Sequence, residues 1–365
     1  MNFAERVLAW QATYGRRDLP WQASRDPYRV WLSEVMLQQT QVATVRGYFS
    51  RFISRFPDVR ALAAADADAV LALWSGLGYY SRARNLHRCA RQVMEQHGGE
   101  FPNSAALLET LPGIGRSTAA AIAAFCFGER VAIFDGNVRR VLARALGFDA
   151  DLAVPANERA LWRRATELLP ERDSMETMPR YTQGLMDLGA TVCHARKPAC
   201  ARCPLAEICV AMHAGEPERL PVRARKLVRK VLDWWLLIAR DERGAVWLER
   251  RPESGIWAGL HCLPVYESEE ALEFAIASAH RSQQGEAVLD SLPPIVHKLT
   301  HRDLRLHPVI ARIGPHDWPS VHRAAESIPD GDGTARMGCF MEPSEWADRG
   351  LPAPIRVLID TLQEQ

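Results

Sequence analysis

Hydrophobic residues recur every three to four positions through most of residues 1–212. This spacing places apolar side chains on one face of an α-helix. Gly and Pro separate successive stretches and mark where helices begin and end. We therefore expect helices at about 3–16, 29–45, 47–55, 66–74, 82–97, 104–109, 116–127, 136–146, 157–168 and 180–188. Strand patterns are scarce there, so the first part of the chain is predicted to be all-α.

The pattern changes after residue 230. Residues 213–230 are polar, basic and carry two prolines, a composition typical of a linker. Apolar runs at 234–239 and 245–249 then flank a polar turn, which predicts a β-hairpin. A helix near 268–282 and strands at 295–299 and 304–313 are expected to follow. The predicted organisation is a helical domain over 1–212, a linker over 213–230 and an α+β domain over 231–365.

The composition is that of an ordinary globular protein. The chain has 365 residues, 47% of them hydrophobic and 24% charged. No apolar run approaches the roughly 20 residues that a membrane span requires, and the first residues lack the pattern of a signal peptide. We therefore expect a cytoplasmic protein whose eight cysteines stay reduced rather than paired in disulfides.

The formal net charge of +1 conceals two oppositely charged parts. Residues 1–230 carry 32 Lys and Arg against 23 Asp and Glu, whereas residues 231–365 carry 13 against 21. A basic N-terminal part favours contact with a polyanion, although many basic domains bind nothing anionic.

Four cysteines lie close together, and their spacing is C-x6-C-x2-C-x5-C. Converging thiolates select zinc or an iron–sulfur cluster. Zinc sites usually pair two short C-x2–4-C segments, and this loop has only one. Four unrelated core cysteines are the weaker interpretation at this density. The candidate ligands are Cys193, Cys200, Cys203 and Cys209.

The segment LPGIGRSTA at 111–119 joins two expected helices through a Gly-x-Gly turn. Gly113 and Gly115 allow the backbone to approach a ligand closely. The helix that begins at Arg116 and Ser117 directs its positive end the same way. Together these features predict a sequence-independent phosphate cradle, although a Gly-x-Gly turn alone is more often only a turn.

Two acidic residues have surroundings suited to catalysis. Asp135 directly precedes an expected helix, where an Asp commonly serves only as an N-cap. Glu34 lies among apolar neighbours, with Gln38 one turn on along the same expected helix. Burial raises the pKa of a carboxyl group and lets it donate a proton. Taken alone, the Glu34 segment fits a surface glutamate on an amphipathic helix better.

These motifs together resemble the endonuclease III superfamily of DNA glycosylases. The runs SEVMLQQTQV at 33–42 and GLGYYSRARNL at 76–86 resemble its adenine glycosylase branch, the MutY family. The resemblance covers residues 1–212 continuously. It implies a helix-hairpin-helix near 104–127, an iron–sulfur loop at 193–209 and one [4Fe–4S] cluster per chain.

The resemblance also implies roles for individual residues. Glu34 would protonate the adenine, Asp135 would stabilise or capture the sugar cation, and Asn137 would orient Asp135. Gln39 would fill the space near the flipped-out base and Tyr79 would wedge beside the lesion, although helix packing is a competing role for Tyr79. The expected DNA contacts also include Gly113, Gly115, Arg116, Ser117 and Arg139.

Two positions separate this chain from lyases of the superfamily. The endonuclease III branch carries a lysine nucleophile where this chain has Ser117, so no amine is placed to form a Schiff base. Some members of the adenine glycosylase branch carry a lysine where this chain has Arg139, and a guanidinium is a poor nucleophile but a good phosphate ligand. A monofunctional, hydrolytic glycosylase is expected.

The run RRPESGIWAGLHCLP at 250–264 resembles the C-terminal, Nudix-like domain of the adenine glycosylases. The expected helix near 268–282 lacks the Arg-Glu-x-x-Glu-Glu run of Nudix hydrolases, so pyrophosphate hydrolysis is not expected. In the family this domain recognises 8-oxoguanine. Thr300 and His301 align with the serine and histidine of the recognition loop, and Leu299 replaces its phenylalanine. A plain turn with a surface histidine is the alternative.

The resemblance implies an adenine DNA glycosylase of base excision repair that acts on adenine opposite 8-oxoguanine or guanine in duplex DNA. An endonuclease III-like lyase is disfavoured by Ser117. A DNA-binding module with a redox-sensing cluster would need neither Glu34 nor Asp135. We expect a monomer in the bacterial cytoplasm, nucleoid-associated when acting on DNA, with no membrane partner. Contact with a sliding clamp or other repair proteins stays open, since no motif secures it.

Overall fold

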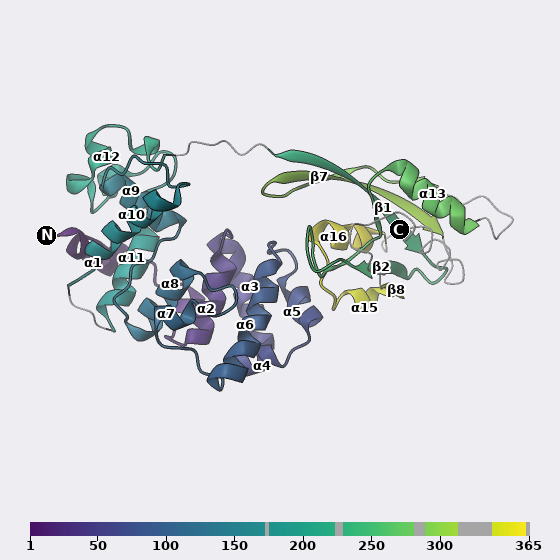
Figure 1. Ribbon diagram of the computed structural model, residues 1–365, viewed down its shortest axis with the longest axis horizontal. Helices are drawn as coiled ribbons and strands as arrows, with labels where there is room; N and C mark the ends of the chain where they lie inside the picture. Colours follow the sequence, from purple (N-terminus) through teal and green to yellow (C-terminus); the bar gives the residue numbers. More distant parts are fainter. Residues whose placement is uncertain (172–174, 223–228, 281–288, 313–337, 363–365) are drawn as a thin grey trace. The chain divides into compact units, whose positions relative to one another are not determined.

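The computed structural model describes residues 1–171, 175–222, 229–280, 289–312 and 338–362. The chain forms two compact units (Figure 1). The helical unit comprises Met1–Ala64 and Asn85–Lys226, and the C-terminal unit comprises Ala65–Arg84 and Leu227–Gln365. In the described ranges, no helix is long and apolar enough to cross a membrane.

The helical unit is built from short helices whose first turns are closed by polar side chains. Asn2, Asp26, Asp58, Ser104 and Asp135 each accept a hydrogen bond from a first-turn N–H group. The helices are α1 (Phe3–Tyr14), α2 (Pro27–Leu37), α3 (Val42–Arg55), α4 (Val59–Ala63), most of α6 (Ser81–His97), α7 (Ala105–Leu108), α8 (Arg116–Phe127), α9 (Gly136–Ala145), α10 (Pro155–Glu167), α11 (Thr177–Thr191) and α12 (Val210–His213). Four 3₁₀ turns, η1 (Pro20–Gln22), η2 (Cys200–Arg202), η3 (Ala206–Ile208) and η4 (Pro217–Arg219), complete it.

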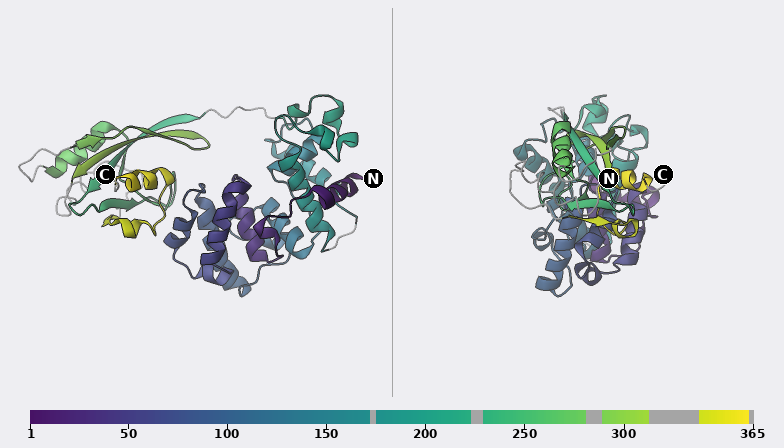
Figure 2. Two further views of the ribbon diagram at one scale, coloured as in Figure 1. Left: turned by 180° about the vertical axis from the view of Figure 1, so that it is seen from behind. Right: turned by 90° about the vertical axis from the view of Figure 1, so that its right-hand side faces the viewer.

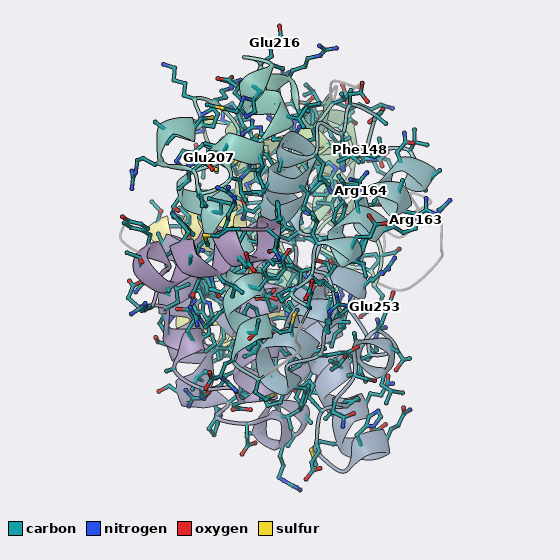
Figure 3. The ribbon with its side chains drawn as sticks, turned by 90° about the vertical axis from the view of Figure 1, so that its left-hand side faces the viewer. Phe148, Arg163, Arg164, Glu207, Glu216 and Glu253 are labelled. Atoms are coloured by element: carbon teal, nitrogen blue, oxygen red, sulfur yellow. The ribbon has the colours of Figure 1, made fainter. Side chains whose placement is uncertain are left out.

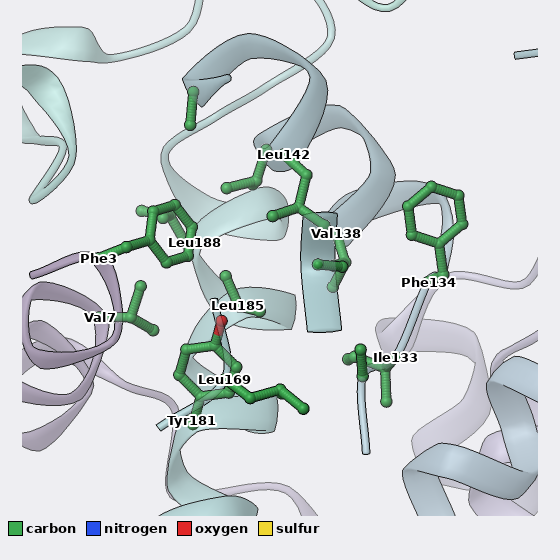
Figure 4. Close-up of a cluster of buried hydrophobic side chains, with 14 of the residues drawn as sticks. Phe3, Val7, Ile133, Phe134, Val138, Leu142, Leu169, Tyr181, Leu185 and Leu188 are labelled. Atoms are coloured by element: carbon green, nitrogen blue, oxygen red, sulfur yellow. The ribbon is translucent and has the colours of Figure 1, made fainter. Parts of the chain in front are cut away.

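A large core of this unit gathers around α11. Figure 4 shows Tyr181, Leu185 and Leu188 of α11 together with Val138 and Leu142 of α9, and all five are buried. Small residues let neighbouring helices come close to α11: a Cβ atom added to its Gly184 would lie 2.9 Å from a methyl group of Val7 on α1. The central position of α11 matters for the site, because its polar face reaches the same cavity as α2.

One expected helix is interrupted. The pattern predicted a continuous helix over 29–45, but α2 ends at Leu37 and α3 begins at Val42. Gln39 adopts a φ of +58°, a left-handed conformation that no helix interior accommodates. The prediction was wrong because the local hydrophobic pattern carries no signal for a single residue in a left-handed conformation.

The C-terminal unit contains a mixed β-sheet. Its centre is β1 (Lys230–Arg240) paired in parallel with β7 (Arg302–Arg312), in a register that places Trp235 beside His307. The main strand order is β3-β2-β1-β7-β5, with β4, β6 and β8 pairing to β1, β7 and β2. The remaining strands are β2 (Val246–Arg250), β3 (His261–Cys262), β4 (Val265–Tyr266), β5 (Leu289–Ser291), β6 (Ile295–Lys298) and β8 (Gly338–Met341). The predicted hairpin is confirmed, since β1 and β2 are antiparallel.

Helices cover both faces of this sheet. α13 (Glu269–His280) packs Leu272, Ala275 and Ile276 against Leu237 and Ala239 of β1. α16 (Ala353–Thr361) lies on the opposite face, as the right-hand view of Figure 2 shows. The short α15 (Pro343–Trp346) precedes it. The predicted architecture, an all-α part followed by an α+β part, is therefore confirmed.

A segment from early in the sequence, residues 65–84, also belongs to the C-terminal unit. It contains α5 (Ala67–Trp74). Ser75 Oγ and the Tyr80 hydroxyl both donate to the carbonyl oxygen of Leu351, over 3.0 and 3.1 Å. The carboxylate of Asp68 pairs with Arg349 over 3.0 Å. These contacts fix the short loop that carries Tyr79.

Candidate active site

A cavity of about 270 Å³ opens beside Glu34 in the helical unit. It is formed where α1, η1, α2 and α11 approach one another, so residues from distant parts of the chain line it. The lining residues are Gln11, Arg16, Arg17, Trp21, Gln22, Ser24, Arg25, Val30, Ser33, Glu34, Phe125, Pro179, Arg180 and Gln183. Trp21, Val30, Phe125 and Pro179 supply the apolar part of this lining, and the other ten residues are polar or charged. Convergent polar groups of this kind can orient a small polar ligand.

The surroundings of Glu34 favour its protonated form. It sits near the end of α2, whose neighbouring residues Ser33 and Val35 are buried. Burial raises its pKa to about 8, and the nearby carboxylate of Asp135 adds to the rise. Glu34 therefore keeps its proton near neutral pH, as expected from its apolar sequence neighbours.

Asp135 is surrounded by groups that favour its charged form. It is the N-cap of α9, and its Oδ1 accepts from the Val138 N–H over 2.7 Å. Burial raises its pKa, while hydrogen bonds from Val138 and Asn137 and the charge of Arg140 oppose that rise. Glu34 has no such donors among the causes that shift its pKa. Burial thus disfavours the charged form of both acids, and hydrogen-bond donors partly offset this effect at Asp135.

Asn137 connects Asp135 to the cysteine loop. Its side chain hydrogen-bonds Asp135, and its Oδ1 accepts from Arg140 Nη2 over 2.8 Å. Arg140 also donates to the carbonyl oxygens of Gly189 (2.6 Å) and Cys193 (2.7 Å). The position of Asp135 is therefore tied through two side chains to the backbone of the first cysteine.

A second feature of the cavity was not anticipated from the sequence. Gln183 donates from Nε2 to Asp187 Oδ1 over 2.8 Å. Asp187 is fully buried, and it also accepts from the backbone N–H and Nε of Arg16, over 2.9 and 2.7 Å. A carboxylate only accepts, so the amide nitrogen of Gln183 must face Asp187. This leaves its carbonyl oxygen as the acceptor for a bound molecule. The only signal in the sequence was the spacing of Arg180, Gln183 and Asp187, which places these three polar residues along one face of α11.

The hairpin at 111–119 has the predicted backbone. Gly113 has a φ of +77°, and a Cβ atom there would lie 2.6 Å from Asn85 Cβ. Gly115 is the N-cap of α8 and provides no side-chain cap, so a ligand can reach the first N–H groups. The Ser117 hydroxyl faces inward and accepts from the Phe134 N–H over 3.0 Å. It thereby holds the residue that precedes Asp135.

Gln39 and Tyr79, the two residues expected near the flipped base and the lesion, share an unusual conformation. Their φ angles are +58° and +49°. Such strain in residues other than glycine clusters at functional sites. The Tyr79 side chain is 45% exposed, and its hydroxyl hydrogen-bonds Thr300 Oγ1 over 2.6 Å. His301, next to Thr300, is exposed.

Arg139 is engaged within the protein. Its guanidinium pairs with Glu158 of α10 and lies over the ring of Phe134, 5.1 Å from the centroid. The sequence could not reveal this pairing, since the two residues lie on different helices.

The four cysteines of the loop share one environment. Burial raises the pKa of Cys203 to about 11, and Cys193, Cys209 and Cys200 each add to the rise. Arg144, which is 2% exposed, donates to Cys193 Sγ over 3.3 Å and to His194 O over 2.6 Å. Within the described ranges, no three ligand side chains converge on a single metal ion. An iron–sulfur cluster does not require this, because each thiolate binds a different iron. The residues fit such a cluster.

Comparison with known proteins agrees with this geometry. Residues 32–167 match the HhH-GPD superfamily of base excision DNA repair proteins, residues 193–209 match the iron–sulfur binding domain of endonuclease III, and residues 234–361 match the NUDIX domain. A solved thermostable thymine-DNA glycosylase superposes with a TM-score of 0.51 at 28% identity, covering 58% of this chain and 95% of that one.

Two relatives align with most of the chain. The adenine DNA glycosylase of Buchnera aphidicola subsp. Acyrthosiphon pisum is 35% identical and covers 85% of this chain and 87% of its own. That of Buchnera aphidicola subsp. Schizaphis graminum is 30% identical over 98% of both chains. Since these relatives span both units and the family matches coincide with the helical domain, the cysteine loop and the sheet, the chain belongs to the adenine DNA glycosylase family.

Proposed function

We propose that the protein hydrolyses the glycosidic bond of adenine paired with 8-oxoguanine, or with guanine, in duplex DNA. The observation that carries this proposal is the pair formed by Glu34 and Asp135. One is a carboxylic acid that keeps its proton near neutral pH, and the other is a carboxylate held by N–H donors. Depurination needs both a proton donor and a stabiliser of positive charge.

The cavity supports a purine with an amino group. The flipped adenine enters it, because the glycosidic bond cannot be reached inside the base stack. Glu34 transfers its proton to N7 of the base. The carbonyl oxygen of Gln183, held by Asp187, accepts a hydrogen bond from the exocyclic 6-amino group. A 6-oxo purine offers an acceptor at that position, so it is disfavoured.

The bond from C1′ to N9 then breaks, and its electron pair leaves with the protonated base. Asp135 stabilises the positive charge that develops on C1′. A water molecule attacks C1′ and gives its proton to the Glu34 carboxylate, which restores the acid. The products are free adenine and an abasic site.

A monofunctional reaction follows from the absence of an amine. Residues 1–196 contain no lysine at all, and Ser117 occupies the position of the lyase nucleophile with its hydroxyl engaged by Phe134. No lysine side chain from this part of the chain can therefore form a Schiff base with C1′. Strand breaks are therefore expected only after alkali.

The remaining residues act on the DNA and on the lesion. The uncapped start of α8, with the backbone of Gly113 and Gly115, receives a phosphate. Gln39 and Tyr79 fill space around the displaced base and the lesion, and Thr300 with His301 contacts 8-oxoguanine. Cys193, Cys200, Cys203 and Cys209 would hold a [4Fe–4S] cluster, which would stiffen their loop. Arg140 of α9 donates to the Cys193 carbonyl oxygen of that loop and to Asn137 Oδ1, and so positions Asn137.

Single-turnover base release from duplexes with adenine opposite 8-oxoguanine, guanine or thymine tests the proposal. Fast adenine loss opposite 8-oxoguanine, with strand breaks only after alkali, is the expected result. Glu34→Gln should abolish base release while leaving duplex affinity within about twofold, because amide and acid have the same shape. Cleavage of an oxidised-thymine duplex without alkali would instead place the protein among the lyases.

A further inference from the structure

We propose that a second phosphate site lies on α10, separate from the base cavity and from the hairpin glycines. A surface hollow of about 350 Å³ is lined by Arg116, Ala156, Arg159 and Arg163. Its ligand class is the phosphodiester of a DNA duplex. The inference rests on the proposed action on DNA. It adds a contact to the DNA backbone that does not depend on the base sequence.

The charges that line this hollow have no counterions. Among the described residues, no carboxylate pairs with Arg116, Arg159 or Arg163, and no carboxylate is part of the lining. The next arginine along α10 behaves differently, since Arg164 pairs with Glu167 over 3.1 Å. Figure 3 labels Arg163 and Arg164, and both are exposed on α10. Neutralised arginines therefore adjoin the hollow, while those that line it remain available.

Keeping these charges together is unfavourable without a ligand. Arg159 and Arg163 are four residues apart on one helix, so their guanidinium groups lie on the same face and repel. Arg116 adds a third positive charge from the start of α8. An anion bound between them would relieve this repulsion.

The site is partly preorganised. The Arg116 guanidinium lies 4.1 Å from the centre of the Trp162 ring, and Trp162 stacks on Phe134 with centroids 4.9 Å apart. This stacking limits the side-chain entropy lost when Arg116 binds. Arginine also presents N–H groups in a fixed fork that matches a phosphate.

The backbone contributes in the same direction. α10 has 13 residues, and its N-cap Val154 provides no side-chain hydrogen bond. Ala156, in the first turn, is one of the lining residues. Pro155 has no N–H group, and those of Asn157 and Glu158 donate to the carbonyl oxygen of Val154. The backbone therefore offers an anion the N–H group of Ala156 and the positive end of the helix. The lining contains no aromatic ring for a base to stack on, which favours the DNA backbone over a nucleobase.

The test compares the full-length protein with Arg159→Gln/Arg163→Gln, using Arg164→Gln as the matched control. Duplex affinity is measured from 50 to 200 mM KCl, both with the mispair and with an undamaged duplex. Each lost phosphate contact lowers the slope of log K against log salt by about 0.9. The slope for the double variant should be smaller by about 1.8. Between 50 and 200 mM KCl, the affinity of the wild type should therefore fall by a factor about 12 times larger than that of the double variant.

Three further results are expected. Arg164→Gln should leave the slope within about 0.3 of the wild type. Arg159→Lys/Arg163→Lys should restore most of the slope, because lysine keeps the positive charge. A purely structural role of the two arginines would not be restored by charge alone. The single-turnover rate at saturating enzyme should be unchanged, since neither arginine lines the base cavity. Unaltered melting temperature and visible absorbance confirm that the variants are folded.

Equal slopes for the double variant and the wild type would overturn the site, as would an equal loss in Arg164→Gln. The undamaged duplex keeps this test independent of catalysis. If the wild type released no adenine, the proposed function would fail, while the salt dependence would still decide whether α10 binds phosphates.

Discussion

The two carboxyl groups proposed to act in catalysis have different hydrogen-bond partners. Glu34 projects from α2 into a cavity, where burial and a nearby carboxylate oppose its ionisation. Asp135 is buried as well, but it caps a helix and receives N–H donors. The identity of the acid and of the charge stabiliser is thus decided by neighbouring atoms rather than by residue type.

This difference sets a pH dependence for base release. The pKa of Glu34 is raised to about 8, so its acid form is present below that pH and is lost above it. The single-turnover rate should be nearly constant from pH 6 to 7 and fall about tenfold per unit well above pH 8. Rates measured between pH 6 and 10 at saturating enzyme check this. A rate that rises through pH 8 would show that Glu34 acts first as a base.

The buried carboxylate of Asp187 should control base selectivity without touching the base. Asp187→Asn can donate to Gln183, so the glutamine amide can turn and offer its NH2 group to the base. The preference for adenine over hypoxanthine should fall about tenfold, the equivalent of one hydrogen bond of ~1.4 kcal/mol. Single-turnover rates on the two bases measure the ratio. An unchanged ratio in a folded variant would exclude this role.

At the scale of elements, the site depends on how closely α9 approaches α11. Gly189 of α11 faces the residue that orients Asp135: a Cβ atom there would lie 2.5 Å from Asn137 Cβ and 3.0 Å from its backbone. The same helix carries Gln183 and Asp187 on another face. Helix α11 therefore holds the base-recognising glutamine and the start of α9 in one rigid arrangement.

Gly189→Ala should separate these helices. The clash is with backbone, which cannot rotate away, so we expect a loss of about 1–3 kcal/mol in stability and a slower base release. Gly47→Ala on α3 is the matched control, since no described atom lies within 4 Å of its added Cβ. It should be neutral or stabilising by up to ~1 kcal/mol. Thermal melts and single-turnover rates check both, and equal effects of the two changes would contradict the explanation.

At the scale of the whole molecule, the chain does not divide in sequence order. Residues 65–84 belong to the same compact unit as the sheet. Tyr79 lies in this segment and Thr300 follows β6, and their hydroxyl groups are hydrogen-bonded. Two residues proposed to act at the lesion are therefore held together although 221 positions separate them.

Loosening this segment should weaken lesion recognition. Asp68→Asn removes the charge partner of Arg349, which is partly exposed, so we expect a stability loss of only about 1 kcal/mol. The preference for 8-oxoguanine over guanine opposite adenine should fall several-fold, while the rate with guanine at saturating enzyme stays unchanged. Asp348→Asn, an exposed neighbour of Arg349, is the control. A preference equal to the wild type's would show that residues 65–84 take no part in recognition of the lesion.

The sequence by itself determined the features that are encoded within short segments. Helix α8 spans 116–127 as predicted, and Asp135 was identified both as an N-cap and as a candidate catalytic group. The candidate metal ligands followed from the spacing of the four cysteines, and the raised pKa of Glu34 followed from its apolar neighbours in the sequence. Periodicity, capping preference and ligand spacing depend only on residues a few positions apart, so they can be identified from the sequence without knowledge of the tertiary structure.

The tertiary structure alone decided which side chains meet. It interrupted the expected helix at Gln39, turned the Ser117 hydroxyl toward Phe134, and engaged Arg139 with Glu158. It also brought Arg16 to Asp187, 171 positions away, and so fixed the amide of Gln183. Such contacts arise when helices pack and buried polar groups must find partners. No local pattern specifies the partner of such a group. The proposed acid, Glu34, was therefore predictable from the sequence, whereas Gln183, which is proposed to recognise the base, was not.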